Sequence, residues 1–147
     1  MIEPEYYSAW FDIIDQAKHR HGWPIPTYIE QYMSAVLANY TDKPDWQPQP
    51  SWAETLLSIQ TAHAAKVLGD QALFAAAVFP NMLERRGINQ DYFYQIGKAS
   101  YSHAEQINYH LFNTLSRNFE FLAECMNYSV QNSPRMTPWY PKDSSSK

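Results

Sequence analysis

Apolar residues recur every three or four positions along most of this chain, which is the spacing of an amphipathic helix. The first such segment spans residues 5–19, and Gly22 and Pro24 predict where it ends. Its apolar face consists of Tyr7, Trp10, Ile14 and Ala17. The same spacing returns in later segments, so the pattern predicts an all-α protein.

Two Ser/Thr-x-x-Glu motifs predict where the next helices begin. Thr27 and Glu30 form the first motif, and Ser51 and Glu54 form the second. In such a capping box the hydroxyl accepts a hydrogen bond from a free backbone N–H, while the glutamate reaches back to the N-cap N–H. We therefore expect a side-chain cap at both starts.

The helices that follow these two starts are expected over residues 27–40 and 51–68. Three prolines lie in residues 41–50, so this connection is expected to be extended. The later helix is apolar or small on nearly every face, which is typical of a helix contacted from several sides. We expect it to be central.

Glycine and proline divide the next part of the chain. Gly69 and Asp70 predict a break, with Asp70 as the N-cap of a new helix. Pro80 disfavours helical geometry at the residue before it, so a kink or restart is expected there. Gly87 then ends the element, and Ile88 suits the hydrophobic contact of a Schellman motif.

The last helical stretch, residues 92–130, keeps its spacing almost without pause, and Asn89 is expected to cap its start. An unbroken helix of this length would extend about 60 Å, too far for a compact domain of this size. We therefore predict a break between Ser102 and His110, although neither proline nor glycine marks it.

These elements predict one domain over residues 1–132, a bundle of five or six helices. Residues 133–147 form a tail with proline and serine, whose last residues are expected to be disordered. The middle of this tail, around Trp139 and Tyr140, is apolar enough to predict docking on the bundle or on a second chain.

Composition narrows the possible functions. The 147 residues include a single cysteine, Cys125, which excludes an intrachain disulfide and a cysteine-based zinc site. No signal peptide is apparent, and the longest apolar run is far shorter than the roughly 20 residues of a membrane span. A cytoplasmic protein without membrane contact is expected. The net charge is −4 and no basic stripe exists, so nucleic acid is not an expected partner.

Histidines are the first candidates for chemistry. His63 lies on an apolar helical stripe, and His103 and His110, seven residues apart, share a face if their helix is continuous. On that condition all three are expected to face the core. Core-facing imidazoles can ligate a metal, but a buried histidine bonded to a neighbour is the interpretation we favour. Glu-x-x-His and His-Glu-x-x-His are both absent, so we predict no metal and no cofactor.

Nucleophilic catalysis has no sequence support either. Cys125 lies in a core-like stretch, where a free cysteine usually behaves as a small hydrophobe. Neither a Gly-x-Ser-x-Gly elbow nor a glycine-rich phosphate loop occurs among only four glycines. No catalytic residue is predicted, and the balance lies against an enzyme.

The stretch from Gly69 to Tyr101 holds the densest cluster of unusual residues. Arg85 and Arg86 end a predicted helix, where they are expected to pair with Asp70 or Asp91. The alternative is that one arginine holds a carboxylate or phosphate of a partner. A glycine inside a helix, at position 97, predicts the close approach of another helix or a ligand.

The same stretch carries a string of motifs: Gly69-Asp70-x-x-Leu73-Phe74, Phe79-Pro80, Arg85-Arg86-Gly87 and Asp91-Tyr92-Phe93-x-x-x-Gly97-x-x-Ser100-Tyr101. This string resembles one in bacterial helical proteins of unassigned function, and it covers about a quarter of the chain. The resemblance implies an all-helical bacterial protein and no particular activity.

The function we predict is a non-enzymatic interaction or regulatory module that associates with itself or with another protein. Aromatic residues beyond the needs of a small core favour a contact surface. They are Tyr6, Trp10, Trp46, Trp139 and Tyr140.

Two alternatives remain. The first is a bundle that binds a small apolar ligand or a metal between helices. The second is an enzyme with His63 or His103 as general base beside Asp70 or Glu105. The candidate ligand-binding residues are His63, Asp70, Arg85, Arg86, Tyr92, Tyr101 and His103.

Overall fold

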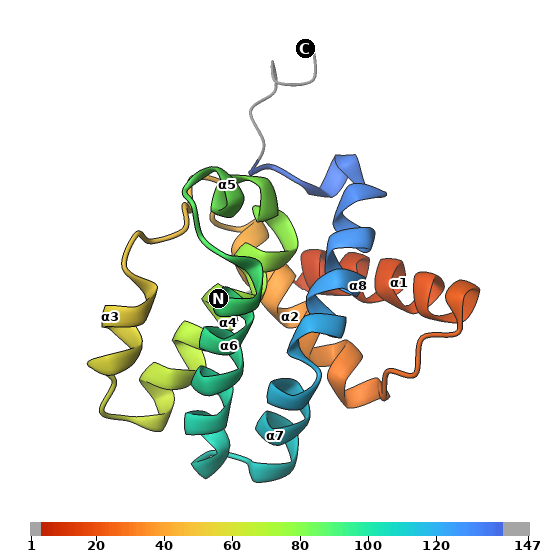
Figure 1. Cartoon of the computed structure of the whole chain (residues 1–147). Coiled ribbons are helices and arrows are strands. Elements are labelled where there is room, and N and C mark those ends of the chain that lie inside the picture. Colours follow the sequence, from red (N-terminus) through yellow and green to blue (C-terminus); the bar gives the residue numbers. More distant parts are fainter. Residues whose placement is uncertain (1–3, 140–147) are drawn as a thin grey trace. The chain divides into compact units, whose positions relative to one another are not determined.

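Helices account for all regular structure in the described part of the chain, residues 4–139 of a computed structural model (Figure 1). The all-α prediction is confirmed, with eight α-helices where five or six were expected. The α-helices are α1 Pro4–His21, α2 Thr27–Thr41, α3 Trp52–Leu57, α4 Ala62–Val78, α5 Pro80–Arg85, α6 Gln90–His103, α7 Tyr109–Arg117 and α8 Phe119–Gln131. Two 3₁₀ turns, η1 Ala104–Gln106 and η2 Pro134–Met136, complete the order.

The described residues form two compact units. One unit comprises residues 4–47 and 128–139, and the other comprises residues 48–127. The boundary falls inside α8. Between residues 4 and 139, no helix has both the length and the apolar character needed to cross a bilayer.

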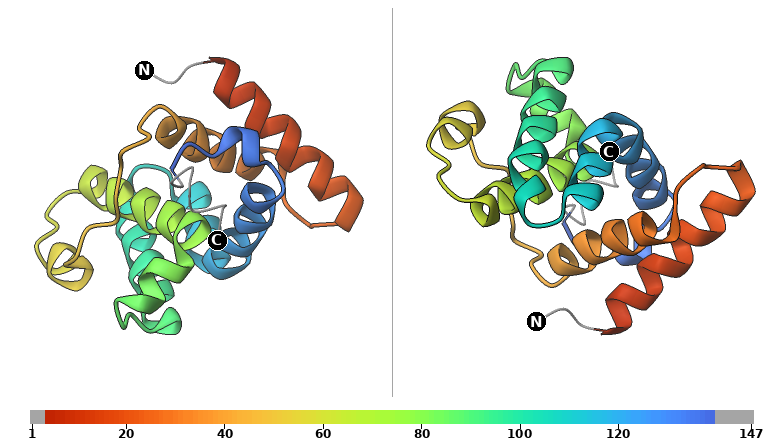
Figure 2. Two further views of the ribbon diagram at one scale, coloured as in Figure 1. Left: turned by 90° about the horizontal axis from the view of Figure 1, so that it is seen from above. Right: turned by 90° about the horizontal axis from the view of Figure 1, so that it is seen from below.

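In the first unit, α1 packs against α2 (Figure 2). The predicted apolar face of α1 is confirmed, since Trp10, Ile14 and Ala17 are all buried. α1 ends as expected before Gly22, whose φ of +67° is a conformation that favours glycine. The pattern and the stop residue together explain this helix.

Trp139 belongs to the core of the same unit. It is only 4% exposed, and its Nε1 donates a 2.6 Å hydrogen bond to the carbonyl oxygen of Tyr40. Its ring stacks on Trp10, with 6.4 Å between the ring centroids. The expected docking of the apolar tail is thus confirmed for Trp139. Trp10 and Trp139 are core residues, and Tyr140 and the predicted disordered end lie outside the described residues.

The capping box at Thr27 is wrong. The N-cap of α2 is Pro26, which makes no side-chain cap bond, and Thr27 is already the first helical residue. A proline N-cap has no N–H for a glutamate to accept, so the reciprocal bond cannot form. Glu30 instead turns inward, where it is 1% exposed and accepts a 3.1 Å hydrogen bond from Lys18 Nζ.

In the second unit, α4 packs against α6, and α3 contacts both. The single helix expected over 51–68 is wrong: α3 ends at Leu57, and α4 starts at Ala62. Ser51 makes no side-chain cap bond, whereas Thr61 accepts one from the backbone N–H of Ala64 at 3.0 Å. The effective cap therefore lies ten residues later than predicted.

The break predicted at Gly69 and Asp70 is also wrong, because both residues lie inside α4. A Cβ at position 69 would lie 2.6 Å from Cδ1 of Tyr101, so the glycine provides room for a ring from α6. Asp70 is a helix-interior residue rather than an N-cap. Tertiary packing explains this glycine better than a turn does.

The expected helix boundaries around α5 are confirmed. α4 ends just before Phe79, and α5 restarts at Pro80. Gly87 has a φ of +77°. The N–H of Ile88 donates to the carbonyl of Leu83 at 3.0 Å, the 6→1 bond of a Schellman motif. Asn89 caps α6 as predicted, accepting a 3.0 Å bond from the N–H of Tyr92.

The predicted break between Ser102 and His110 is confirmed as well. α6 ends at His103, η1 follows, and α7 begins at Tyr109 with Asn108 as its side-chain cap. A second break at Asn118, between α7 and α8, was not predicted. The long stretch 92–130 thus consists of three helices.

Candidate functional site

Of the seven candidate ligand-binding residues, the structure brings Asp70 and Tyr101 into direct contact. Tyr101 is fully buried, and its hydroxyl donates a 2.7 Å hydrogen bond to Asp70 Oδ1. Lys66 Nζ lies 3.0 Å from Asp70 Oδ2 in the same helix. A buried tyrosine hydroxyl needs such a partner, so this cluster links α4 to α6 structurally.

The expectation that His63, His103 and His110 face the core is wrong, because all three are exposed. α4 begins at Ala62, so the apolar stripe assumed for residues 51–68 does not continue through His63. His103 and His110 lie on different helices, so they share no continuous face.

The alternative of an enzyme would place His63 or His103 as general base beside Asp70 or Glu105. Within residues 4–139, neither His63 nor His103 hydrogen-bonds to either carboxylate; Glu105 instead accepts from Asn113. The same residues contain no group of three or more His, Cys, Asp and Glu side chains placed to hold a metal ion.

Arg85, Arg86 and Tyr92 are exposed and lie apart from the Asp70 cluster's hydrogen bonds. Arg86 donates a 3.1 Å hydrogen bond to the carbonyl of Pro48. The expected pairing of the arginines with Asp70 or Asp91 is not formed among the described residues. Arg86 binds the Pro48 carbonyl instead, and Asp70 binds Lys66 and Tyr101.

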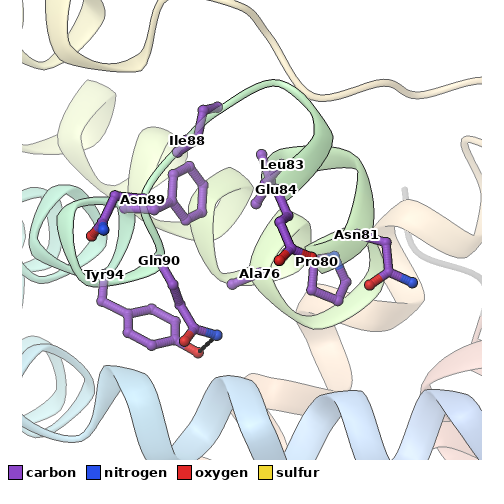
Figure 3. A pocket seen from close by; sticks show the side chains of 10 residues that line it. Ala76, Pro80, Asn81, Leu83, Glu84, Ile88, Asn89, Gln90 and Tyr94 are labelled. Atoms are coloured by element: carbon purple, nitrogen blue, oxygen red, sulfur yellow. Dashed lines mark hydrogen bonds between the residues drawn. The ribbon is translucent and has the colours of Figure 1, made fainter.

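A cavity of about 460 Å³ lies between α5 and α6, over the end of α4 (Figure 3). Figure 3 shows Glu84 reaching into it from α5, with Gln90 and Tyr94 on the α6 side and Ala76 between them. Its apolar wall is formed by Ala76, Pro80, Leu83, Ile88 and Phe93, and its polar wall by Asn81, Glu84, Asn89, Gln90 and Tyr94. We call this space the α5–α6 cavity.

Tyr94 provides the most buried polar group of the α5–α6 cavity. The residue is 6% exposed, and its hydroxyl oxygen accepts a 3.0 Å hydrogen bond from Gln90 Nε2. Burial raises the pKa of Tyr94, and the negative charges of Glu124, Glu120 and Asp91 raise it further. The phenol therefore keeps its proton at neutral pH and can serve as a hydrogen-bond donor.

Glu84 is the only charged side chain in the lining of the α5–α6 cavity. It is exposed, and no cation among the described residues pairs with it. The lining contains no histidine, cysteine, serine or lysine. The arrangement therefore suits recognition of a small amphiphilic group better than nucleophilic or imidazole-based chemistry.

No family model, curated protein or solved structure matches this chain.

Local sequence signals predicted the helix boundaries next to the α5–α6 cavity but not the cavity itself. The proline that starts α5, the glycine that ends it and the cap of α6 were all predicted. The cavity itself depends on how α5, α6 and the end of α4 pack together, which no local pattern specifies. Glu84, Gln90 and Tyr94 were missed for that reason.

Proposed function

We propose that this protein is a non-enzymatic binding module and that the α5–α6 cavity is its binding site for a small molecule. The observation that carries the proposal is the Gln90–Tyr94 hydrogen bond, which lies in the polar wall of a cavity whose other wall is apolar. Ligand sites typically combine such walls with a few placed polar groups, in volumes of about 300–1,000 Å³.

The construction of the site also supports recognition. The connection from α5 to α6, which contributes Ile88 and Asn89 to the lining, is fixed by a Schellman turn and by the Asn89 cap of α6. These hydrogen bonds, one between backbone groups and one from a backbone N–H to the Asn89 side chain, restrict the chain before any ligand arrives. A preformed site loses less conformational entropy on binding than a flexible one.

The proposal is tested by filling the cavity. Ala76→Leu adds three carbon atoms to the wall, and Ala64→Leu makes the same change at an exposed position of the same helix. A fragment library is screened against both variants and the native protein by NMR chemical-shift perturbation. We expect hits whose shifts cluster around Gln90 and Tyr94, that are lost in Ala76→Leu, and that persist in Ala64→Leu.

A variant with a smaller perturbation guards against misfolding of Ala76→Leu. Tyr94→Phe removes only the hydroxyl and should weaken hits that use it. A screen with no hit near Gln90, or hits unaffected by both cavity variants, would contradict the proposal.

Self-association is a second candidate function. The tryptophans at positions 10 and 139 no longer support it, but Leu57 on α3 is 86% exposed and Tyr109 is 65% exposed. Exposed apolar side chains favour a protein contact when they are grouped, and single ones are common on monomers. Light scattering of the native protein and Leu57→Gln tests this candidate: a concentration-dependent dimer that the substitution weakens would support it.

The cytoplasmic location and the bacterial family suggested by the motif string stay predictions.

A further inference from the structure

The one charged side chain that lines the α5–α6 cavity is a carboxylate, and neither Arg85 nor Arg86, which follow it at the end of α5, belongs to the lining. Glu84 lines the cavity, and Asp91 lies in the first turn of α6, which provides part of the polar wall. Neither carboxylate has an ion-pair partner in the part of the chain that the structure describes. Glu120 and Glu124 also act on Tyr94, but Lys98 and Arg117 line the same surface hollow as these two glutamates and offset them.

The uncharged polar groups of the wall are compatible with a donor-rich ligand. Asn81 and Gln90 each carry an amide oxygen that can accept a hydrogen bond, and the Glu84 carboxylate accepts only. An ammonium group is the complementary chemistry, because it offers three donors and no acceptor.

The start of α6 has the opposite electrostatic tendency. A helix N-terminus carries a partial positive charge that favours anions. Here Asn89 already satisfies the N–H of Tyr92, and Asp91 places a carboxylate in the first turn. Both features reduce the attraction for an anionic ligand. The carboxylate of Glu84, which has no ion-pair partner among the described residues, therefore determines that the cavity favours a cation.

We infer that the α5–α6 cavity selects a small organic ammonium ion, with its charged group at Glu84 and its apolar part against Leu83 and Phe93. The inference rests on the proposed function, since it specifies the ligand class of the same cavity. It distinguishes this class from neutral and anionic molecules of equal size.

The test uses three probes of nearly equal shape: 2-phenylethylammonium, 2-phenylethanol and phenylacetate. Dissociation constants are measured by NMR titration at low and moderate salt. We expect the ammonium ion to bind about threefold more tightly than the alcohol. This preference lies within the interaction energies measured for exposed ion pairs. Phenylacetate should bind more weakly than either. Salt should weaken binding of the ammonium ion and leave the alcohol unaffected.

Two substitutions assign the preference to its residue. Glu84→Gln keeps the shape of the side chain and should reduce the ratio of ammonium to alcohol affinity to about one. Glu54→Gln removes an exposed carboxylate from α3 and should leave the ratio unchanged.

The outcomes separate the inference from the proposed function. Equal or tighter binding of the alcohol or phenylacetate in the cavity overturns the inference and leaves a binding cavity in place. A preference for the ammonium ion that survives Glu84→Gln also overturns it. If none of the three probes shifts the resonances of Gln90 or Tyr94, the inference fails, and the fragment screen then decides separately whether the cavity binds anything.

Discussion

Tyr101 reaches from α6 to Asp70 on α4, where its hydroxyl donates a 2.7 Å hydrogen bond to Oδ1 while its ring lies against Gly69. Two neighbouring residues of α4 thus contact the same side chain: the glycine leaves room for the ring, and the carboxylate accepts the hydrogen bond of the hydroxyl. The contact is fully buried on the tyrosine side. It ties together the two helices that form the centre of the second unit.

Tyr101→Phe should lower the free energy of unfolding by about 1–2 kcal/mol, because it removes a hydrogen bond to a charged acceptor and leaves Asp70 with fewer partners. Urea denaturation measures the change. Tyr92→Phe is the matched control, since Tyr92 is 52% exposed on the same helix and should change stability by less than about 0.5 kcal/mol. Equal effects of the two substitutions would show that the Tyr101–Asp70 bond contributes nothing.

Gly97→Ala should destabilise the protein, although alanine is the better helix former. A Cβ at position 97 would collide with the ring of Phe119. Overpacking of this kind typically costs about 1–3 kcal/mol, against about 1 kcal/mol gained in helix propensity. Thermal and urea unfolding of Gly97→Ala test the sign.

The double variant Gly97→Ala with Phe119→Leu checks the cause. A smaller side chain at 119 makes room for the new methyl group, so the added alanine should be less harmful in the Phe119→Leu background. An alanine that stabilises the native protein would mean that the ring yields easily. In that case the glycine is not required for packing.

Glu30 should make the protein less stable as the pH rises. Burial raises the pKa of Glu30 above its ordinary value of 4.5, and the neighbouring carboxyl of Asp15 raises it further, while Lys18 opposes both. The folded state therefore holds this proton more tightly than the unfolded state. Stability from this group is fully present below pH 4.5 and is lost as the pH rises through the higher folded-state pKa.

Urea unfolding of native protein and Glu30→Gln between about pH 4 and 7 measures that loss. The variant cannot ionise, so its stability should fall less over this interval. Glu54→Gln, at an exposed site, should follow the native curve. Parallel curves for Glu30→Gln and the native protein would mean that the buried carboxyl is ionised without penalty.

Cys125 should resist alkylation until the protein unfolds. It is 3% exposed, and burial together with the charge of Glu124 raises its thiol pKa to about 12. Very little thiolate exists at neutral pH, and reagents have no access to it. Mass spectrometry after iodoacetamide treatment should show one adduct in denaturant and none in buffer. Rapid labelling of the folded protein would place Cys125 at a site of frequent local opening.

Candidate-site residues were harder to predict than helices. Asp70 and Tyr101 were named and do meet, but they meet as a structural pair. His63 was assigned to the core because a helix over 51–68 was assumed to continue in phase, and the break after Leu57 changed that phase. One misplaced boundary was enough to move His63 from the core to the surface.

What the sequence determined by itself is the helical class and several helix boundaries: Pro80 starts a helix because it lacks an N–H, Gly22 and Gly87 end helices with positive φ, and Asn89 caps a helix start with its own side chain. These are properties of single residues and their nearest neighbours, so they can be read locally. Tertiary structure decided the rest. Gly69 lies inside a helix and leaves room for a ring that is distant in sequence, and Glu30 turns inward toward a lysine of another helix. The α5–α6 cavity likewise depends on side chains from three helices, a relationship that no single segment contains.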